Sequence, residues 1–151
     1  MPIIEARSEA ELAAVRDLFT EYWNSFGFTP CFQGFGEEVA SLPGKYTVLG
    51  LLILEDAPAG CVALRPLDDT RAEFKRLYVR SAYRGLGLGH VLLDWIIQRA
   101  RDLGYRELVA DTMPEMTTAL AMYQRAGFEI TGPYAEDPTP GAVYLRLCLV
   151  G

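Results

Sequence analysis

The stretch that decides the fold runs from Glu73 to Gly104 and reads EFKRLYVRSAYRGLGLGHVLLDWIIQRARDLG. Its beginning, as far as Val79, has the aromatic and apolar residues that are typical of a β-strand. From about Gly87 to Leu103 the apolar residues recur at the spacing of one helix face, and Gly104 suits a left-handed helix cap. The sequence therefore predicts a strand and a helix joined by a short glycine-rich loop.

The loop itself, from Tyr83 to His90, has glycines that alternate with leucines. A glycine-rich turn that opens a helix brings unbonded backbone N–H groups and the positive end of the helix dipole to one point, which makes an anion site. Glycine lets phosphate oxygens come close to those N–H groups, because a Cβ atom would block their approach. Arg84 stands beside the loop, where its guanidinium can add a charge-assisted hydrogen bond.

Taken alone, the loop fits more than one interpretation. A Walker loop is excluded, because no Gly-Lys-Ser/Thr sequence follows. A dinucleotide fingerprint has the spacing GxGxxG within repeating βα units, whereas this loop is GxGxG and follows a run of strands. Asp111 nevertheless ends the next strand about where a ribose-binding acid would stand. A glycine-rich turn that holds no ligand is the remaining alternative.

The rest of the chain supplies strands on both sides of this stretch. Ser8 and Glu11 have the spacing of a capping box that starts a helix after a first short strand. Three strand-like runs between Tyr46 and Val79 predict an antiparallel meander, and Gly27 to Pro43 is irregular with a short helical piece near its end. A strand, a helix closed by Gly127 and two last strands follow. We expect an α+β domain, a mixed sheet with helices on its faces.

Composition limits the class of protein. The chain has 151 residues, enough for a single domain covering residues 1–151, and half of them are hydrophobic. A net charge of −6 argues against nucleic-acid binding, although Lys75, Arg76, Arg80 and Arg84 cluster locally. The longest apolar run, Val48 to Leu54, is far shorter than the ~20 residues that span a bilayer. We expect neither a membrane segment nor a signal peptide.

The cysteines and the histidine indicate the compartment and the absence of a metal. Cys31, Cys61 and Cys148 are scattered and odd in number, as expected for reduced thiols in a cytoplasmic protein. With a lone histidine and no CxxC motif, we predict no metal site. Cys61 and Cys148 lie in apolar strand runs and are expected in the core. None of the cysteines resembles a catalytic nucleophile, so we expect no reaction that passes through a covalent intermediate on a cysteine.

The deciding stretch, together with the later segments YRELVADT and ALAMYQRAGF, resembles the GNAT superfamily of acyl-CoA-dependent N-acyltransferases. The family's Arg/Gln-x-x-Gly-x-Gly/Ala motif is matched by Arg84, Gly87 and Gly89, with Gly85 as the frequent extra glycine. The family's Y-x-x-x-G-F pattern is matched by Tyr123 to Phe128. More narrowly, CFQGF, LPG, GCVALRPL, EFKRLYV and DTMPEM look like a small bacterial branch whose substrates are mostly unassigned.

The resemblance implies the fold and the cofactor. It implies a GNAT fold: a mostly antiparallel sheet of about six or seven strands, about four flanking helices, and central strands that splay apart at the cofactor. It implies acetyl-CoA as acyl donor, with the coenzyme A pyrophosphate in the loop and the pantetheine arm paired to the strand end like an added strand. The implied cofactor residues are Leu77, Tyr78, Val79, Arg84, Gly85, Leu86, Gly87, Leu88, Gly89 and His90. Homodimers are common in the family, so a homodimer is a possible assembly.

The resemblance also implies which side chains carry the chemistry. An alkylamine with a pKa near 10.4 is protonated at neutral pH, so a base must take its proton. Glu73 is the candidate base, with a water chain or a salt bridge of Glu73 to Lys75 or Arg71 as the alternatives. Tyr123 is the candidate acid for the departing thiolate, with a buried helix aromatic as its alternative. A backbone N–H near Leu77 or Tyr78 would meet the oxyanion.

The acceptor side is the least specified by the sequence. Many family members carry Asn where this chain has Met116, and Thr117 or Thr118 could take over its contact. By family analogy, the segment from Gly27 to Pro43 and the loop PYAEDPTPGA are the acceptor walls. The candidate substrate residues are Phe32 and Tyr134. Tyr22 and Phe35 are expected mainly in the core, and Glu37 or Glu38 could meet an ammonium group.

The sequence therefore predicts an N-acetyltransferase that acts on a primary amine of a small molecule or peptide. The alternative is a non-catalytic acyl-CoA-binding module that serves as a sensor or partner surface. A nucleotide-dependent oxidoreductase that binds NAD is a third interpretation. Amino acid, polyamine, aminoglycoside, peptide and protein N-terminus all remain open as acceptors.

Overall fold

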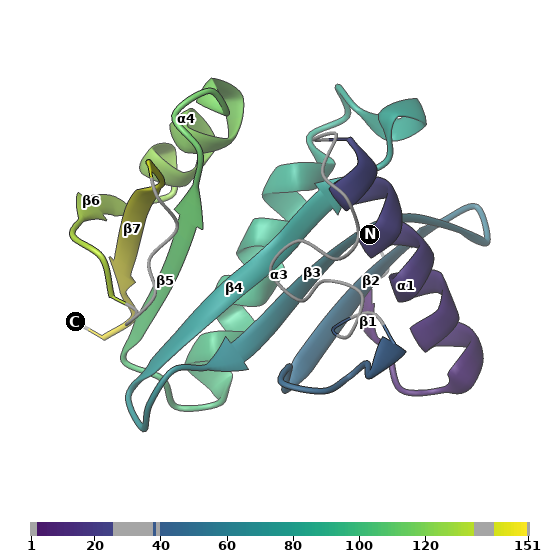
Figure 1. Ribbon diagram of the computed structural model, residues 1–151, viewed down its shortest axis with the longest axis horizontal. Helices are drawn as coiled ribbons and strands as arrows, with labels where there is room; N and C mark the ends of the chain where they lie inside the picture. Colours follow the sequence, from purple (N-terminus) through teal and green to yellow (C-terminus); the bar gives the residue numbers. More distant parts are fainter. Residues whose placement is uncertain (1–2, 26–37, 39, 135–140, 151) are drawn as a thin grey trace.

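The computed structural model describes residues 3–25, 38, 40–134 and 141–150. Its centre is a seven-stranded sheet with the strand order β1-β2-β3-β4-β5-β7-β6 (Figure 1). The strands are β1 (Ile3–Glu5), β2 (Val48–Leu54), β3 (Ala57–Pro66), β4 (Arg71–Val79), β5 (Glu107–Thr112), β6 (Glu129–Thr131) and β7 (Val143–Cys148). Neighbouring strands run antiparallel except β4 and β5, which are parallel. The expected mixed, mostly antiparallel sheet and the α+β class are confirmed.

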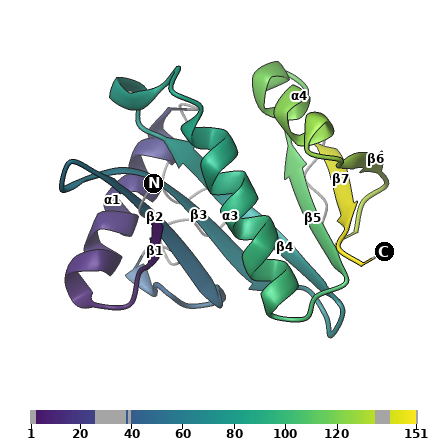
Figure 2. The ribbon, with the colours of Figure 1, turned by 180° about the vertical axis from the view of Figure 1, so that it is seen from behind.

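Helices cover both faces of the sheet. Helix α1 (Glu9–Asn24) lies on one face, and α3 (Leu88–Asp102) and α4 (Thr117–Arg125) lie on the other (Figures 1 and 2). The described residues contain three helices rather than the expected four or so. The difference arises because the fourth was expected near the end of the segment from Gly27 to Pro43, which lies largely outside the described residues. No helix among residues that the structure describes is long and apolar enough to cross a membrane.

The helix ends follow from local sequence chemistry. Ser8 caps α1: its hydroxyl accepts from the Glu11 N–H at 3.2 Å, and the Glu11 carboxylate accepts from the Ser8 N–H at 3.0 Å. Helix α3 begins after Gly87, whose φ of 75° is left-handed, and Gly104 beyond its end has a φ of 89°. The predicted capping box and the predicted helix from Gly87 to Leu103 are both confirmed, to within a residue at each end.

Two separate apolar clusters hold the helices to the sheet. On the α3 face, fully buried leucines and isoleucines of the helix, such as Leu92 and Ile96, pack on β3 and β4 residues such as Phe74. On the α1 face, Phe19 and Trp23 pack on the other side of β2 and β3. Burying each such side chain contributes about 1.5–3 kcal/mol. The two clusters fix the position of the β4–loop–α3 unit from both faces.

Strands β4 and β5 separate halfway along the sheet. They pair only from Arg71 to Glu73, with Glu107 to Val109 as partners. Beyond that point β5 stays paired with β7 as far as Thr112, while β4 continues to Val79 and, among the strands that the structure describes, pairs only with β3. The splay is visible as the widening gap between the two arrows in Figure 1. The backbone edge of β4 that faces β5 is therefore open from Phe74 onward.

A β-bulge in β4 changes which face its side chains occupy. The register to β3 shifts between Cys61 and Ala63, and Arg76 has a left-handed φ of 59°. Phe74 and Leu77 both pack in the cluster on the α3 face. Lys75 and Arg76, between them, both belong to the opposite face. The bulge thus sets two positive side chains next to each other where the strands splay.

Candidate functional site

A pocket of about 720 Å³ lies between the end of β4, the glycine loop and α4. This volume is in the range of pockets that bind small molecules and cofactors. It is lined by all of the predicted cofactor residues except Leu86: Leu77, Tyr78, Val79, Arg84, Gly85, Gly87, Leu88, Gly89 and His90. Leu86 is 64% exposed and does not line the pocket. The structure thus brings the strand end, the loop and the helix start together at one cavity.

The loop presents backbone N–H groups to this pocket. The first helical hydrogen bond of α3 runs from the Val91 N–H to the Gly87 carbonyl at 3.3 Å. The N–H groups of Leu88, Gly89 and His90 precede it, so the helix itself uses none of them. The positive end of the helix dipole adds to their attraction for an anion. These residues line the pocket, which makes this end of the cavity suited to phosphate oxygens.

The loop glycines are required by backbone conformation. Gly85 and Gly87 have left-handed φ values of 83° and 75°. A Cβ atom on either would meet nothing within 4 Å, so crowding within the protein does not select glycine there. Arg84 folds back on the strand, where its Nε donates to the Val79 carbonyl at 3.1 Å and its guanidinium lies 5.7 Å from the Tyr78 ring. Arg84 therefore ties the loop to the end of β4.

A smaller cavity of about 100 Å³ lies deeper, in the splay between β4 and β5. Its lining residues are Tyr22, Phe74, Lys75, Arg76, Leu77, Asp111, Thr112, Met116, Ala119, Met122 and Tyr123. Several of them, including Leu77, Met116 and Met122, also line the large pocket. The two cavities therefore adjoin, and a ligand in the large pocket would reach the splay past these shared side chains.

Tyr123 of α4 lines the small cavity and also belongs to the hydrophobic core. It is 7% exposed, and its ring packs edge-on to Phe74 at 5.3 Å and against Phe128 at 6.0 Å. Burial raises the pKa of Tyr123 well above its usual value, with a smaller contribution from the charge of Asp111. The phenol therefore keeps its proton throughout the neutral range and is available as a donor inside the cavity.

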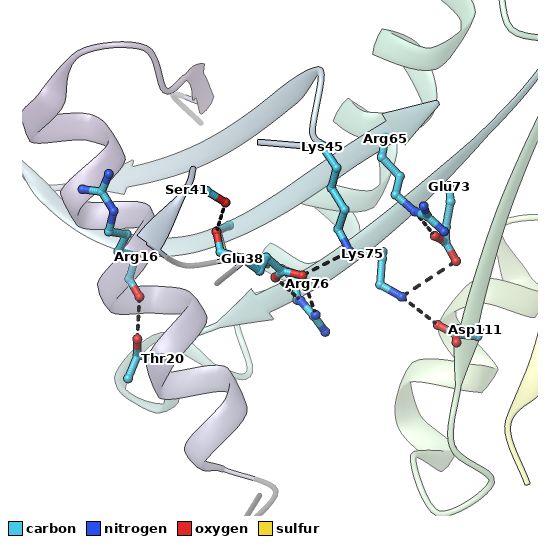
Figure 3. Close-up of polar contacts among 11 residues, drawn as sticks. Arg16, Thr20, Glu38, Ser41, Lys45, Arg65, Glu73, Lys75, Arg76 and Asp111 are labelled. Atoms are coloured by element: carbon cyan, nitrogen blue, oxygen red, sulfur yellow. Dashed lines mark hydrogen bonds and ion pairs between the residues drawn. The ribbon is translucent and has the colours of Figure 1, made fainter. Parts of the chain in front are cut away.

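Glu73 lies behind the small cavity. The residue is 2% exposed, and Arg65 Nε lies 2.5 Å from its carboxylate (Figure 3). The Tyr134 hydroxyl also donates to this carboxylate. Lys75 Nζ is 3.9 Å away, while Arg71, the other predicted partner, pairs with Asp68 at 2.8 Å. Glu73 lines neither cavity. The structure does not bring this candidate base to the pocket. Glu73 forms a salt bridge, as its alternative interpretation had it, but the close partner is Arg65, which was not predicted. Of the two predicted partners, Lys75 is distant and Arg71 pairs elsewhere.

Asp111 is a carboxylate at the small cavity that the sequence did not identify as a candidate base. It stands in β5 just past Val109, the last β5 residue that pairs with β4, and it lines the small cavity. Lys75 Nζ lies 3.8 Å from its Oδ1 (Figure 3). The signal in the sequence was its place near the strand end, which pointed only to a ribose-binding acid. The splay, which the residues alone do not reveal, is what opens the small cavity beside Asp111.

The expected acceptor residues have different outcomes. Phe32, Phe35, Glu37 and Cys31 lie outside the described residues. Tyr134 is bound to Glu73, and burial together with that carboxylate raises the pKa of its phenol. Tyr134 thus belongs to the contacts that hold Glu73, and it lines neither of the two cavities.

Tyr22 and Glu38 differ from what the sequence predicted. Tyr22 lines both cavities rather than serving the core alone, and burial raises its pKa to about 12. Glu38 is occupied within the protein: Arg76 donates to both of its oxygens at 3.0 Å, and Lys45 lies 3.2 Å away (Figure 3). Glu38 is therefore not open to a substrate ammonium group.

The helix position that departs from the family pattern borders both cavities. Met116 lines each of them, and its sulfur accepts from the Thr112 hydroxyl at 3.5 Å. Thr117 and Thr118 line the large pocket. Both hydroxyl side chains are exposed at the start of α4, where they are placed to contact a bound ligand.

The remaining candidates are structural. Cys61 is fully buried, as expected, but Cys148 is exposed, because it ends β7 at the edge of the α3-face cluster. Of the local basic cluster, Arg80 pairs with Glu21 at 2.5 Å, Arg76 is held by Glu38, and Arg84 by the Val79 carbonyl. Lys75 differs, because its ion pairs with Asp111 and Glu73 are long, at 3.8 and 3.9 Å. No group of three or more potential metal ligands occurs in the part of the chain that the structure describes.

Comparisons with known proteins agree with this geometry. Residues 12–128 match the model of the acetyltransferase (GNAT) family. An uncharacterized N-acetyltransferase of Schizosaccharomyces pombe is 38% identical over 136 residues, which cover 86% of this chain and 83% of that protein. Human N-acetyltransferase 8 is 37% identical over 83 residues, 52% of this chain and 37% of that protein.

Solved structures share the whole fold. A GNAT-family acetyltransferase from Staphylococcus aureus superposes with a TM-score of 0.82 at 18% identity, over 99% of each chain. An aminoglycoside 6'-N-acetyltransferase, solved in complex with coenzyme A, superposes with a TM-score of 0.76 at 16% identity, over 100% of this chain and 98% of that one. At these identities the likeness concerns the fold alone.

Proposed function

The chain belongs to the acetyltransferase (GNAT) family, and from that premise we propose that it transfers an acetyl group from acetyl-CoA directly to a primary amine of a small molecule or peptide. One observation carries the proposal. The splayed edge of β4, the glycine loop and the start of α3 meet at a single pocket of about 720 Å³, and this pocket adjoins a small cavity that contains a protonated phenol. The structural neighbour solved with coenzyme A has the same fold.

The residues around the pocket fit acetyl-CoA. The N–H groups of Leu88, Gly89 and His90 would hold the pyrophosphate. The edge of β4 from Leu77 to Val79 would accept the pantetheine arm as an added strand, because no strand among the described residues pairs with this edge, although Arg84 already holds the Val79 carbonyl. Acetyl-CoA supplies the acyl group as a thioester. The acyl carbon would then lie near Leu77, which lines both cavities.

The chain's own groups would carry the proton transfers. The amine nitrogen forms a bond to the acyl carbon, the carbon–sulfur bond breaks, and the electron pair leaves with the sulfur. A backbone N–H near Leu77 or Tyr78 would stabilise the charge on the carbonyl oxygen, and Tyr123 would give its proton to the thiolate. The amine's proton must go to a carboxylate or to water. Since Glu73 is sealed by Arg65 and Tyr134, we assign this proton to Asp111 and a positioning role to Glu73.

The test is an assay of thiol release. The purified chain is mixed with acetyl-CoA and a panel of primary amines, and free coenzyme A is measured against a control without amine. We expect release that depends on both the protein and the amine. Binding of acetyl-CoA without release by any amine would instead support the sensor-module alternative, and binding of NAD in place of acetyl-CoA would support the oxidoreductase. A cytoplasmic location and a homodimer stay predictions.

A further inference from the structure

We propose that Lys75 and Asp111 form the recognition pair for the acceptor: Asp111 binds its amine and Lys75 binds a carboxylate beside that amine. The acceptor class is then an α-amino acid, or another compound in which a carboxylate is adjacent to the primary amine. The inference rests on the proposed acetyltransferase function and narrows its substrate class.

The pair has unfilled hydrogen-bonding capacity. Lys75 Nζ lies 3.8 Å from Asp111 Oδ1 and 3.9 Å from Glu73 Oε2, and both separations exceed hydrogen-bond distance. Among residues 3–25, 38, 40–134 and 141–150, neither side chain makes a hydrogen bond. Yet the Lys75 and Asp111 side chains are only 20% and 24% exposed. An ammonium with three donors and a carboxylate with several acceptor sites, both mostly withdrawn from water, need partners that a ligand can supply.

The ion pairs around them are closed. Glu73 holds Arg65 at 2.5 Å, and Glu38 holds Arg76 through two bonds of 3.0 Å (Figure 3). In each of these the carboxylate and the guanidinium satisfy one another. In Figure 3, Lys75 lies between the carboxylates of Glu73 and Asp111, and its ion pairs with them are long, at 3.9 and 3.8 Å. The Lys75–Asp111 separation of 3.8 Å is thus longer than the 2.5 and 3.0 Å contacts of the neighbouring ion pairs.

The pair is also in the right place for an acceptor. Both side chains line the small cavity together with Leu77 and Tyr123. An amine held by Asp111 would therefore share one chamber with the phenol that we assign to the departing thiolate. Asp111 faces this chamber because β4 and β5 have already separated at its position.

The charges favour an amine that carries a carboxylate. In an α-amino acid one carbon atom separates the ammonium from the carboxylate, so the two groups reach neighbouring partners of opposite charge. A polyamine would bring a second positive charge against Lys75, and Asp111, the one carboxylate in the described lining of the small cavity, would already be occupied by the first. An amide or a decarboxylated amine would leave Lys75 without its new partner.

The first test compares matched acceptors. Thiol release by the full chain is measured with glycine, leucine, phenylalanine and glutamate, each beside its carboxamide and its decarboxylated amine, and with spermidine. We expect kcat/KM for the best amino acid to exceed that for its carboxamide and amine about 10- to 100-fold, the effect of one charge-assisted hydrogen bond. Carboxamides, amines or spermidine that react as well as the acids would overturn the inference and leave the acetyltransferase standing.

The second test assigns the preference to Lys75. In Lys75→Met we expect kcat/KM for the amino acid to fall about 10- to 100-fold, mainly through KM, with little change for the carboxamide. Lys75→Arg should retain the preference. Lys45→Met is the matched control: it removes a lysine from the same region that lines neither cavity, and should leave both rates unchanged. Each variant must bind acetyl-CoA as the parent does, which shows that it is folded.

The outcomes separate the two levels of the proposal. Equal loss of the acid and carboxamide rates in a Lys75→Met protein that binds acetyl-CoA normally would overturn the role of Lys75. Loss of the preference in Lys45→Met would contradict it too. If no amine of the panel caused thiol release, the proposed function would be contradicted, and the inference would fall with it.

Discussion

At the scale of the residue, the two side chains expected to do the chemistry differ in how far the sequence could place them. Tyr123 follows from helical spacing, which sets it on the face of α4 that packs against Phe74. Glu73 was identified through the family resemblance, by its spacing to the strand residues Leu77 to Val79, but its surroundings depend on Arg65 and Tyr134. A local sequence pattern does not show contacts with a neighbouring strand, such as that of Glu73 with Arg65, or with a distant residue such as Tyr134. The sequence therefore could not predict that the Glu73 carboxylate is occupied within the protein.

Tyr123→Phe separates the phenol from the ring. The ring keeps its contacts with Phe74 and Phe128, so we expect the free energy of unfolding to change by less than about 1 kcal/mol. Turnover should fall about 100-fold or more, because the thiolate loses its proton donor. Steady-state kinetics beside acetyl-CoA affinity make the measurement. Unchanged turnover would return Tyr123 to a purely structural role.

Glu73→Gln tests the closed salt bridge. The substitution leaves the Arg65 guanidinium without its carboxylate in a largely buried setting, so we expect a loss of about 1–3 kcal/mol in the free energy of unfolding. Chemical denaturation provides the value. Glu107→Gln is the matched control on the neighbouring strand, because Glu107 is more exposed and its partner Arg146 is 4.0 Å away. Equal, small effects of both substitutions would mean that the Arg65 contact adds nothing.

At the scale of the element, the loop and its helix were well specified by sequence. Glycine chemistry predicted both ends of α3, at Gly87 and Gly104. The β4 bulge was not predictable, because its left-handed residue is Arg76, and a left-handed arginine leaves no mark in the sequence. The splay was implied only by the family resemblance, because it depends on where the pairing of β4 with β5 stops.

Gly87→Glu and Gly104→Glu form a matched pair for the loop. Both glycines have left-handed φ values and open space where a Cβ would lie, so each substitution should cost a similar ~1–2 kcal/mol of stability. Of these two glycines, Gly87 lines the pocket and Gly104 does not. We expect Gly87→Glu to lose acetyl-CoA binding, because it sets a carboxylate at the anion site, and Gly104→Glu to keep it. Calorimetry on both variants checks this; equal affinities would contradict the assignment of the loop.

At the scale of the whole molecule, the sheet with its two covered faces could be predicted, because apolar spacing indicates the type of each element and capping residues and glycines indicate its ends. The assignment of Cys148 to the core was wrong: its neighbours Leu147 and Leu149 pack in the cluster under α3, and an apolar run does not show which of its residues face away from that cluster. The acceptor site was the least predictable part. Its proposed charged groups, Lys75 and Asp111, meet only when strands from distant parts of the chain are assembled.

Alkaline pH should destabilise the fold through its buried phenols. Burial raises the pKa of Tyr22 to about 12 and those of Tyr46, Tyr123 and Tyr134 above their usual value. In the unfolded chain they ionise near pH 10, so their stabilisation is complete below about pH 10 and is lost as the pH rises toward 12 and beyond. Thermal melting with tyrosinate absorbance should show a falling Tm and phenols that ionise on unfolding. A Tm that stays constant above pH 10 would contradict this.

The measurement that tests the central claim most directly is calorimetric titration of the purified chain with acetyl-CoA, with NAD and ATP in parallel. The pocket formed by the open β4 edge, the glycine loop and the start of α3 predicts micromolar binding of acetyl-CoA and none of the two nucleotides at the same concentrations. Absence of acetyl-CoA binding by the folded protein would contradict the acetyltransferase assignment at its foundation.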